Sequence, residues 1–363
     1  MAAEVLAISL LTINAAYWLW YRLCVVSAQS HKKTDHRTLP PVSVVIVYKN
    51  AGRKITDLIK SLLAQDYPEF EILAINDFST DGGPSRLAKV RDPRLRMLNA
   101  TLDAPGKKQA LQQGIKHAGY QHILLTDADC MPASANWIRV MASMLIPETK
   151  TQIILGYGPL NKSNSLLNDF ARFETITTAM QYFSAAVSKI PYMGVGRNMM
   201  YTRSLFESIG GFDSHSHVTS GDDDLFVRDS SGGASINVCL TPDSFMYSDA
   251  KDTLRGYLSQ KSRHISTSVH YRWVHKILLG VLPACHAGFY TVCLTSFLLG
   301  WMAAPTFICL VVSRWLVMYA LLWKPMSLLD GRDLVIKLPL LDLLYFLYYG
   351  ILPVFSLFRK KSW

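Results

Sequence analysis

Charged residues are scarce in this chain. Only 18% of its 363 residues are Asp, Glu, Lys or Arg, and 50% are hydrophobic. Soluble globular proteins carry about a quarter charged residues, whereas disordered chains carry few hydrophobic ones. The composition therefore argues against a wholly soluble protein and against a disordered one. The length exceeds that of one small domain and fits one mid-sized domain with additional parts.

Cysteine pairs with the spacing of metal or redox motifs are absent. The 6 cysteines include no Cys-x-x-Cys pair, and several of them lie within apolar runs. This pattern excludes a disulfide framework and a zinc site of the usual spacing. We therefore expect the polar part of the protein to lie in a reducing compartment.

Long basic runs and aromatic–basic repeats are also missing. Without them no nucleic-acid partner is expected. The net charge is nevertheless +10, with 37 Lys and Arg against 27 Asp and Glu. This positive excess suits an anionic membrane face or a phosphate-bearing ligand.

Long apolar runs are present at both ends of the chain. From Val5 to Gln29 the only charged side chain is Arg22, and the run is longer than the roughly 20 residues that a membrane span needs. Glu4 stands where a signal peptide would carry basic residues, so we expect an uncleaved anchor. Three further apolar runs lie near the C-terminus, over residues 277–302, 303–323 and 334–358.

The last of these runs differs from the others. It carries Lys337 and Asp342, so it is expected either to cross the membrane or to lie along its interface. The runs predict an N-terminal transmembrane anchor over 1–30, a polar domain over 40–275, and a C-terminal membrane region of two or three spans over 277–358.

Basic residues flank the polar domain on both sides. Lys32, Lys33 and Arg37 follow the first apolar run, and five basic residues precede the second: Arg255, Lys261, Arg263, Arg272 and Lys276. Cytoplasmic flanks are enriched in Lys and Arg, so the polar domain is expected to be cytoplasmic in a multi-pass protein of the inner (plasma) membrane. The basic residues at 359–361 conflict with this orientation if the last run crosses fully.

Strand and helix patterns alternate within the polar domain. Apolar runs at 42–47, 70–75 and 122–126 predict buried strands, and the spacing at 55–64 and 106–117 predicts helices. This alternation predicts an α/β fold with a mostly parallel sheet and helices on both faces. Ligands bind such sheets beyond the carboxyl ends of the strands, so the residues that end each strand are the candidate site.

Polar residues end each predicted strand. Asn50 follows the first strand, Asp77 and Asp81 follow the second, and Asp127 and Asp129 follow the third. Carboxylates one residue apart repel each other unless a cation lies between them. Mg²⁺ prefers one or two carboxylates together with phosphate oxygens. The most economical ligand for this edge is a nucleotide with a divalent cation.

A second acidic cluster, Asp222, Asp223 and Asp224, lies far along the chain. Three adjacent carboxylates cannot all ionise comfortably in a cleft, so at least one is expected to have a raised pKa, which suits a general base. A helix start with acidic first-turn residues would explain two of the three without any catalysis.

Two basic motifs are ambiguous by themselves. Lys107 begins a predicted helix, where phosphate binds well, although a solvated basic turn has the same pattern. Gln260 and Arg263 lie just before the second apolar run, and alone they indicate only a basic patch beside the membrane.

Taken in order, these motifs resemble those of membrane-bound family 2 glycosyltransferases, which have the GT-A fold and are inverting enzymes of bacterial type. The resemblance covers about residues 40–265. The turn at 76–81 is similar to the family's Asp-Asp-x-Ser-x-Asp, whose carboxylates contact the base and ribose of a sugar nucleotide. Asn76 stands in the first acidic position, which leaves that role to Asp77. The resemblance also implies Asp129 as the direct metal ligand, assisted by Asp127.

Further matches extend the resemblance. Lys107 lies in a segment similar to the family's Gly-Lys-x-x-Ala-Leu near the diphosphate, and Asn198 lies in a Gly-x-Asn strand of the acceptor side. The acidic cluster resembles the helix start that holds the catalytic base, which falls on Asp222 or on Asp223 depending on the alignment. The final match resembles Gln-x-x-Arg-Trp and comprises Gln260, Arg263 and His264, with His in place of Trp.

The resemblance implies metal-dependent transfer of a sugar, of hexosyltransferase type. The donor would be a nucleotide-diphosphate sugar, the acceptor a lipid or lipid-linked glycan, and the cofactor Mg²⁺ or Mn²⁺, in cell-envelope glycan or glycolipid biosynthesis. A processive polysaccharide synthase is the alternative, although such enzymes generally have more spans. A nucleotidyltransferase and a non-catalytic membrane scaffold are rivals from other classes. The sequence does not indicate the oligomeric state.

Overall fold

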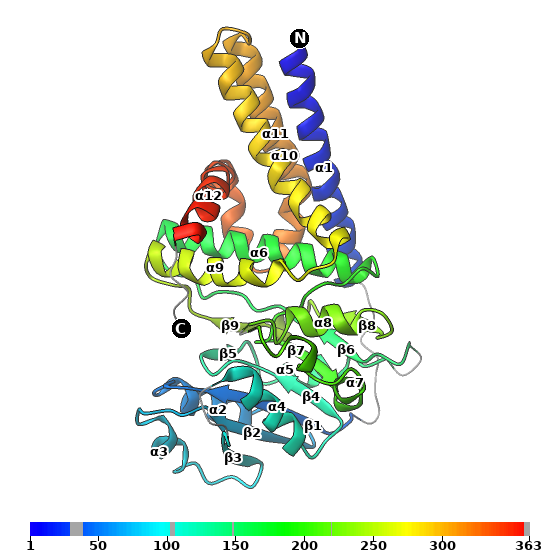
Figure 1. Ribbon diagram of the computed structural model, residues 1–363, viewed down its shortest axis with the longest axis vertical. Helices are drawn as coiled ribbons and strands as arrows, with labels where there is room; N and C mark the ends of the chain where they lie inside the picture. Colours follow the sequence, from blue (N-terminus) through cyan, green and yellow to red (C-terminus); the bar gives the residue numbers. More distant parts are fainter. Residues whose placement is uncertain (30–38, 102–105, 147–148, 219, 359–363) are drawn as a thin grey trace. The chain divides into compact units, whose positions relative to one another are not determined.

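A computed structural model describes residues 1–29, 39–101, 106–146, 149–218 and 220–358 (Figure 1). The predicted basic flank at 32–37 and the basic residues at 359–361 lie outside these residues. The chain divides into two compact units, and the predicted domain boundaries stay predictions. The helical unit comprises Met1–Ser27, Lys162–Ser184 and Ala250–Trp363, and the sheet unit comprises Ala28–Asn161 and Ala185–Asp249.

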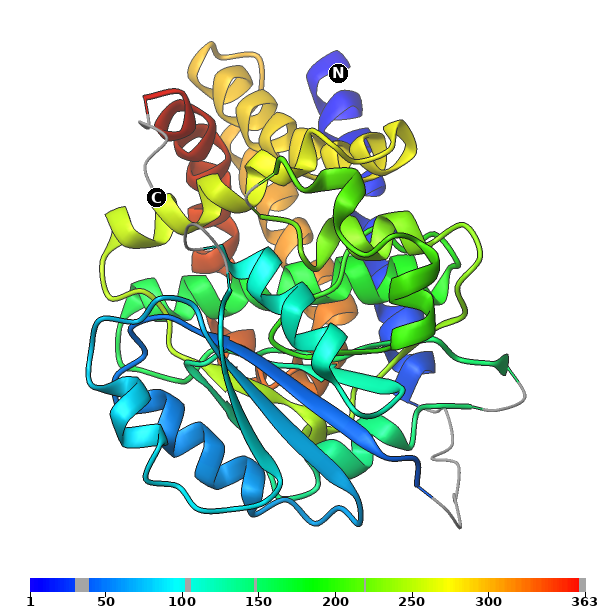
Figure 2. The same cartoon turned by 60° about the horizontal axis from the view of Figure 1, so that its bottom comes forward.

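A seven-stranded sheet forms the centre of the sheet unit (Figure 2). Every pair of neighbours is parallel except those of β7, which is antiparallel to β4 and to β6. The predicted mostly parallel α/β sheet is thereby confirmed. In spatial order the strands are β3 (Leu95–Asn99), β2 (Phe70–Asn76), β1 (Val42–Tyr48), β4 (His122–Leu125), β7 (Met199–Thr202), β6 (Ile153–Leu155) and β8 (Ile236–Val238).

Helices cover both faces of this sheet, as predicted. Successive residues of a strand point to opposite faces. Val44 and its alternate neighbours pack in one core with the apolar side of α2 (Lys54–Leu63). On the other face lies α4 (Lys107–His117), whose Gly114 comes so close to Val45 and Ile75 that an added Cβ would lie 2.8 and 2.6 Å from their side chains. A glycine at this position therefore permits the close approach of helix and sheet.

Shorter elements complete the sheet unit. A small second sheet pairs β5 with β9 in antiparallel fashion. The remaining elements are α3 (Gly83–Leu87), β5 (Cys130–Pro132), α5 (Trp137–Ala142), α7 (Arg203–Ser208), η2 (Asp213–His215), α8 (Asp224–Ser230), η3 (Pro242–Ser244) and β9 (Met246–Ser248).

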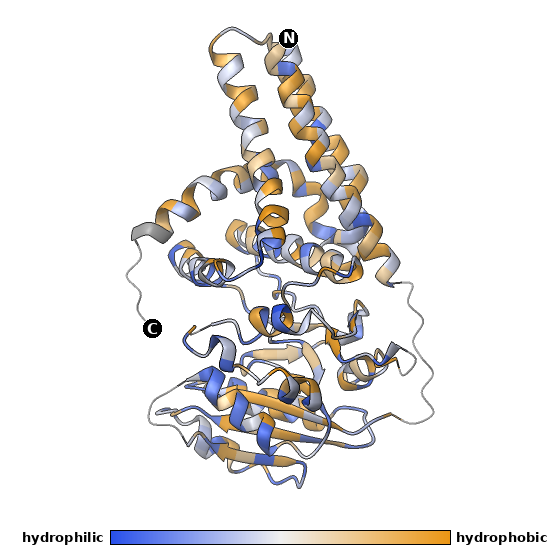
Figure 3. Ribbon diagram, turned by 45° about the vertical axis from the view of Figure 1, so that its right-hand side comes forward, coloured by the Kyte–Doolittle hydropathy of each residue, from blue (hydrophilic) through white to orange (hydrophobic). Residues whose placement is uncertain are grey.

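Long apolar helices make up most of the helical unit. Four segments are long and apolar enough to cross a membrane: α1, α10, α11 and the segment that contains α12. Figure 3 colours them mostly as hydrophobic, and α1, α10 and α11 share an apolar core around Phe289 and Cys293. The elements are α1 (Ala2–Gln29), α6 (Leu166–Val187), α9 (Leu254–Ser268), α10 (Trp273–Leu298), α11 (Ala304–Leu328), η4 (Arg332–Lys337) and α12 (Leu338–Phe358).

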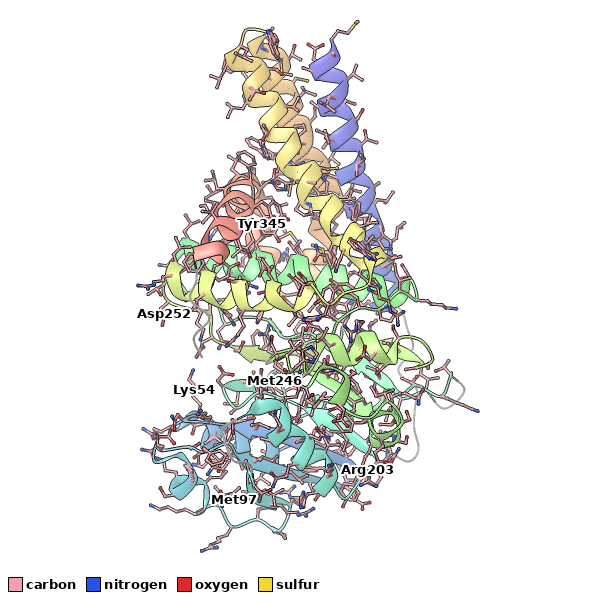
Figure 4. All side chains as sticks on the ribbon, viewed as in Figure 1. Lys54, Met97, Arg203, Met246, Asp252 and Tyr345 are labelled. Carbon is pink, nitrogen blue, oxygen red and sulfur yellow. The ribbon has the colours of Figure 1, made fainter. Side chains whose placement is uncertain are left out.

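The last apolar helix packs differently from the other three. Tyr345 of α12, labelled in Figure 4, contacts Phe170 and Phe173 of α6, with ring centroids 5.7 and 5.5 Å apart. In Figure 1, α12 lies at an angle to α1, α10 and α11 and beside α6 and α9. Whether α12 crosses a membrane or lies along its interface stays a prediction.

A buried polar network joins the four membrane-capable helices α1, α10, α11 and α12. Arg314 of α11 donates from Nε and Nη2 to the two carboxylate oxygens of Asp342 on α12, at 2.8 and 2.9 Å. Its Nη1 donates to Asn14 of α1 at 2.7 Å, and Nη2 lies 3.2 Å from Nδ1 of His286 on α10. Arg314 is 0% exposed and Asp342 is 1% exposed, so this pair is shielded from water.

Candidate active site

The turns after β1 and β2 are bonded to each other at one edge of the sheet. Asn50, with φ of 50°, accepts a hydrogen bond from the Thr80 N–H at 2.8 Å and donates from its own N–H to Ser79 Oγ at 3.1 Å. Asp81 accepts from the Gly52 N–H at 2.7 Å. Because β1 and β2 are parallel and in register, both turns emerge at the carboxyl ends of their strands.

The two residues that begin the second turn have separate roles. Asn76 donates from Nδ2 to Asn99 Oδ1 at 3.1 Å, a bond that the carboxylate of an aspartate could not donate. Asp77 is 4% exposed and accepts from the Gly106 N–H at 3.0 Å. Gly106 is the N-cap of α4, so Asp77 holds the start of the helix that carries Lys107.

Lys107 connects the two acidic clusters. Its Nζ lies 2.9 Å from Asp127 Oδ1 and 3.1 Å from Asp222 Oδ2. Burial by itself would lower the pKa of Lys107, but Asp127, Asp222 and Asp223 outweigh it, and the pKa is well above its usual value. The clusters at 127–129 and 222–224, predicted to share one site, therefore meet around one ammonium group.

Asp127, Asp129 and Cys130 form a cluster that could hold a metal ion, since one ligand atom from each lies within 4.8 Å of the others. Burial raises the pKa of the Cys130 thiol, which donates to Asp129 Oδ1 at 3.8 Å. The thiol is thus a neutral neighbour, and the two carboxylates supply the hard oxygen atoms of the cluster. Sequence reasoning missed Cys130, although it directly follows the Asp-x-Asp motif.

The acids at 222–224 are not equivalent. Asp223 is the N-cap of α8: its Oδ1 accepts from the Asp224 N–H at 2.9 Å and its Oδ2 from the Gly196 N–H at 2.8 Å. Burial raises the pKa of Asp223 well above its usual value, and Asp224 adds to this, although Lys107 and the Gly196 amide oppose it. The expected raised pKa is confirmed for this carboxyl, while Asp222 is the one that reaches Lys107.

Asn198 is buried and uses its side chain within the protein. It is 0% exposed, and its Oδ1 accepts from the indole N–H of Trp137 at 3.0 Å. Its Nδ2 donates to the carbonyl oxygens of Tyr157 and Ser244, both at 2.7 Å. These bonds fix the segment that ends at β7 and contains Gly196, the partner of Asp223.

Gln260 and Arg263 belong to the helical unit. Both lie on α9, where residues three apart share a face, and Arg263 is exposed while Gln260 is half-buried. The acidic clusters at 127–129 and 222–224 belong to the sheet unit.

A further ion pair, absent from the sequence-based expectations, lies near Asp129 and Cys130. Lys54, labelled in Figure 4, donates to Asp249 at 2.8 Å. The bond to Asp249 is the main reason why the pKa of Lys54 is raised. Burial opposes this increase, and the charge of Asp129 adds to it. Asp249 directly follows β9, whose Ser248 pairs with Cys130. This pairing of distant segments leaves no local sequence signal, so the pair could not have been found from the chain alone.

Comparisons with known proteins concern the family and the fold. Residues 43–210 match the model for the family described as Glycosyl transferase family 2. A poly-β-1,6-N-acetyl-D-glucosamine synthase of Staphylococcus epidermidis is 30% identical over 98 residues, which cover 27% of this chain and 24% of the relative. The synthase of the same name from Staphylococcus aureus (strain COL) is 28% identical over 120 residues, which cover 31% of this chain and 29% of the relative. The similarity thus spans less than a third of these relatives' length.

One solved structure is similar over almost the whole chain. It is the mannosyltransferase PcManGT from Pyrobaculum calidifontis in complex with GDP-Man and Mn²⁺. The match covers 99% of this chain and 100% of that one, with a TM-score of 0.63 and 17% sequence identity. At this identity the likeness concerns the fold, and the predicted GT-A fold is confirmed.

Proposed function

We propose, from the premise that residues 43–210 form a family 2 glycosyl transferase domain, that this protein is a membrane-bound, metal-dependent glycosyltransferase. It transfers a sugar from a nucleotide-diphosphate sugar, with inversion, to the hydroxyl group of a lipid or lipid-linked glycan. The observation that carries this proposal is the ammonium group of Lys107, which lies 2.9 Å from Asp127 and 3.1 Å from Asp222.

Asp129 and Asp127 are the residues that would hold the metal. Carboxylate oxygens are the ligands that Mg²⁺ and Mn²⁺ prefer. The residues fit such an ion because Asp127 already attracts the positive charge of Lys107. When bound, the metal supplies positive charge that neutralises the leaving nucleoside diphosphate.

The donor would lie along the edge formed by the turns after β1 and β2. Asn50 and Asp77 stand at that edge and are the candidates for contact with the base and ribose. Lys107 would turn from Asp127 toward the diphosphate, where an ammonium group stabilises phosphate oxygens. Asn198 would act indirectly, because its amide holds the backbone near Gly196.

Asp222 is the general base in this proposal. Its carboxylate reaches the same ammonium group as Asp127, so it stands next to the donor site and can accept the proton of the acceptor hydroxyl. Asp223 instead caps α8 with both of its oxygens. The proton thus passes from the acceptor hydroxyl to an oxygen of Asp222 while the acceptor oxygen bonds to the anomeric carbon. The bond from that carbon to the diphosphate oxygen breaks, and the nucleoside diphosphate leaves with the electron pair.

The acceptor side rests on the membrane character of the chain. Four membrane-capable helices make a lipid or lipid-linked acceptor reasonable, and Gln260 and Arg263 on α9 are proposed to bind it or the diphosphate. Described basic residues at the start of α10, among them its N-cap Arg272 and Lys276 of its first turn, favour a cytoplasmic location for the sheet unit at the inner (plasma) membrane.

The test is a screen of labelled sugar nucleotides with the full chain in native membranes, with and without Mn²⁺. We expect metal-dependent release of a nucleoside diphosphate, and its loss in Asp129→Asn. Asp66→Asn, a change at an exposed surface acid paired with Arg139, is the matched control and keeps activity. Release of pyrophosphate would indicate a nucleotidyltransferase, and no turnover of any sugar nucleotide would indicate a non-catalytic scaffold.

A processive polysaccharide synthase is the second candidate, because the curated relatives are named as synthases of a polymer. Mass spectrometry of the product separates the two. A single-sugar increment supports transfer to a lipid-linked acceptor, and a ladder of products supports processive synthesis.

A further inference from the structure

Lys108 is a buried lysine next to the site that the proposed mechanism does not use. Its residue is 4% exposed, and lysines are seldom buried unless their charge has partners. Lys108 follows Lys107 on the first turn of α4, so its side chain leaves the helix in a different direction. Burial lowers the pKa of Lys108, while Asp222, Asp223 and Asp224 oppose this shift, which indicates that the acids act on this ammonium group.

The partners of this ammonium group are backbone oxygens of one distant segment. Nζ donates to the carbonyl oxygens of His215 at 2.9 Å, Val218 at 2.8 Å and Ser220 at 3.0 Å. It also lies 2.9 Å from Nδ1 of His215. Nζ therefore bonds the carbonyl of His215, the last residue of η2, and the carbonyls of Val218 and Ser220, which lie outside helices and strands. Buried backbone groups at such positions need partners from elsewhere in the fold.

That segment leads directly to the acids. Ser220 is followed by Gly221, whose φ of +90° and contact with Leu225 leave no room for a side chain. Asp222 comes next and reaches Lys107 at 3.1 Å. In the first turn of α4, Lys107 thus binds the Asp222 carboxylate, and Lys108 binds the backbone that leads to Asp222.

We propose that Lys108 is a positioning residue for sugar transfer: its ammonium group fixes the backbone at His215, Val218 and Ser220, and so sets where Asp222 stands beside Lys107 and Asp127. This inference rests on the proposed function. Lys108 itself touches neither donor nor acceptor, so its effect is on the placement of the base and not on binding of the nucleotide.

The test compares Lys108→Met with Lys116→Met in the full chain. Methionine keeps the length of the side chain but donates no hydrogen bonds, and Lys116 is an exposed lysine of the same helix. We expect kcat of Lys108→Met to fall by about 100-fold, the size of effect that a misplaced catalytic group produces. The KM for the sugar nucleotide should change less than about threefold, because Asp127 and Asp129 keep their places.

Several outcomes would overturn the inference. A kcat of Lys108→Met within about twofold of the Lys116→Met control overturns it. A rise in the KM for the sugar nucleotide as large as the fall in kcat overturns it as well. If Lys108→Met does not accumulate in folded form, Lys108→Gln, which keeps two donors, takes its place with the same criteria. If neither variant folds, the role of Lys108 is structural and the inference is wrong.

Two further measurements separate this inference from the proposed function. Hydrogen exchange of the peptide 213–224 should be faster in Lys108→Met than in Lys116→Met, whether or not any sugar nucleotide turns over. In Lys108→Ala, ethylammonium should restore part of kcat, while Na⁺ at equal ionic strength should not. Unchanged exchange together with no rescue would contradict positioning even if wild-type transfer is confirmed.

Discussion

Hydrogen bonds assign different tasks to neighbouring carboxylates. Asp223 receives two backbone N–H groups, one from Gly196 and one from Asp224, and so ties the start of α8 to the segment before β7. Asp222 has its carboxylate beside Lys107. A substitution of Asp223 is therefore expected to lower the stability of the local structure, and a substitution of Asp222 to impair the proposed proton transfer.

The first prediction compares Asp222→Asn with Asp223→Asn. Asp222→Asn should lower kcat by about 100- to 10,000-fold, the contribution of a general base, with little change in melting temperature. Asp223→Asn should cost about 1 kcal/mol of stability, because an amide can satisfy only one of the two N–H groups. Nucleoside diphosphate release and thermal unfolding measure the two effects. The larger loss of kcat in Asp223→Asn, with an unchanged melting temperature, would identify Asp223 as the base.

A second prediction concerns the pH dependence of stability at His215. Burial, then Lys108, lowers the pKa of His215 to about 4, with Asp229 opposing the shift and Arg228 adding to it. Between pH 6.5 and pH 4 the unfolded chain binds a proton at this ring and the folded chain does not. The free energy of unfolding therefore falls as the pH falls through this window, by at most on the order of 3 kcal/mol.

Thermal unfolding from pH 7 to pH 4 checks this prediction. The decrease in melting temperature should be smaller in His215→Gln, which cannot titrate, than in the wild type. His117→Gln, at an exposed histidine of α4, should behave as the wild type does. Equal pH profiles for all three proteins would contradict the prediction.

Among the elements, those with local periodicity were predictable. The buried strands predicted at 42–47, 70–75 and 122–126 and the helices predicted at 55–64 and 106–117 are found within a residue or two of where hydrophobic spacing places them, because burial on one or two faces leaves a pattern in the sequence. The strand-end acids could be predicted for the same reason. In contrast, β7 and the β5–β9 pair are short, and their pairing depends on distant segments, so the sequence carries no local sign of them.

The distinction between Asp222 and Asp223 was also beyond the sequence. It depends on the direction in which the chain enters α8, which Gly221 sets with its φ of +90°. The partners of Lys108 were hidden in the same way, since they are backbone carbonyls more than a hundred residues away.

A third prediction concerns the link between the apolar helices. Arg314→Met should lower stability by about 3–5 kcal/mol, because it leaves the Asp342 carboxylate buried without its main partner. The double variant Arg314→Met/Asp342→Leu should recover most of this loss. Thermal unfolding in detergent measures both. Arg22→Met on α1 is the control, because Arg22 donates to the Ala320 carbonyl at 3.2 Å and its loss leaves no buried carboxylate without its partner. If Arg314→Met is as stable as the wild type, the Arg314–Asp342 pair does not contribute to the stability of the folded protein.

At the scale of the whole molecule, the chain combines a net charge of +10 with four membrane-capable helices. This combination suits a membrane with an anionic surface. If the basic residues near the start of α10 set the orientation, as proposed, the sheet unit would face the side of the membrane where sugar nucleotides are supplied.

A fourth prediction follows for topology. In a Cys309→Ala background, Trp301→Cys, between α10 and α11, should react with an impermeant maleimide in sealed right-side-out vesicles. Lys116→Cys, on α4 of the sheet unit, should react only after lysis. Both positions are exposed, so lack of reaction reports the membrane and not burial. The reverse pattern would place the sheet unit outside.

The reversed direction of β7 has a mechanical consequence. Its pairing with β4 places Leu125 opposite Met199. Asp127 follows Leu125 and Gly196 precedes Met199, so both segments are attached to the same pair of strands. The part of the proposed site that would bind the leaving group and the part that would receive the acceptor hydroxyl are thus joined by the pairing of β4 with β7. We therefore expect these two halves to move together, and any opening for turnover to involve the loops beyond the β4–β7 pair.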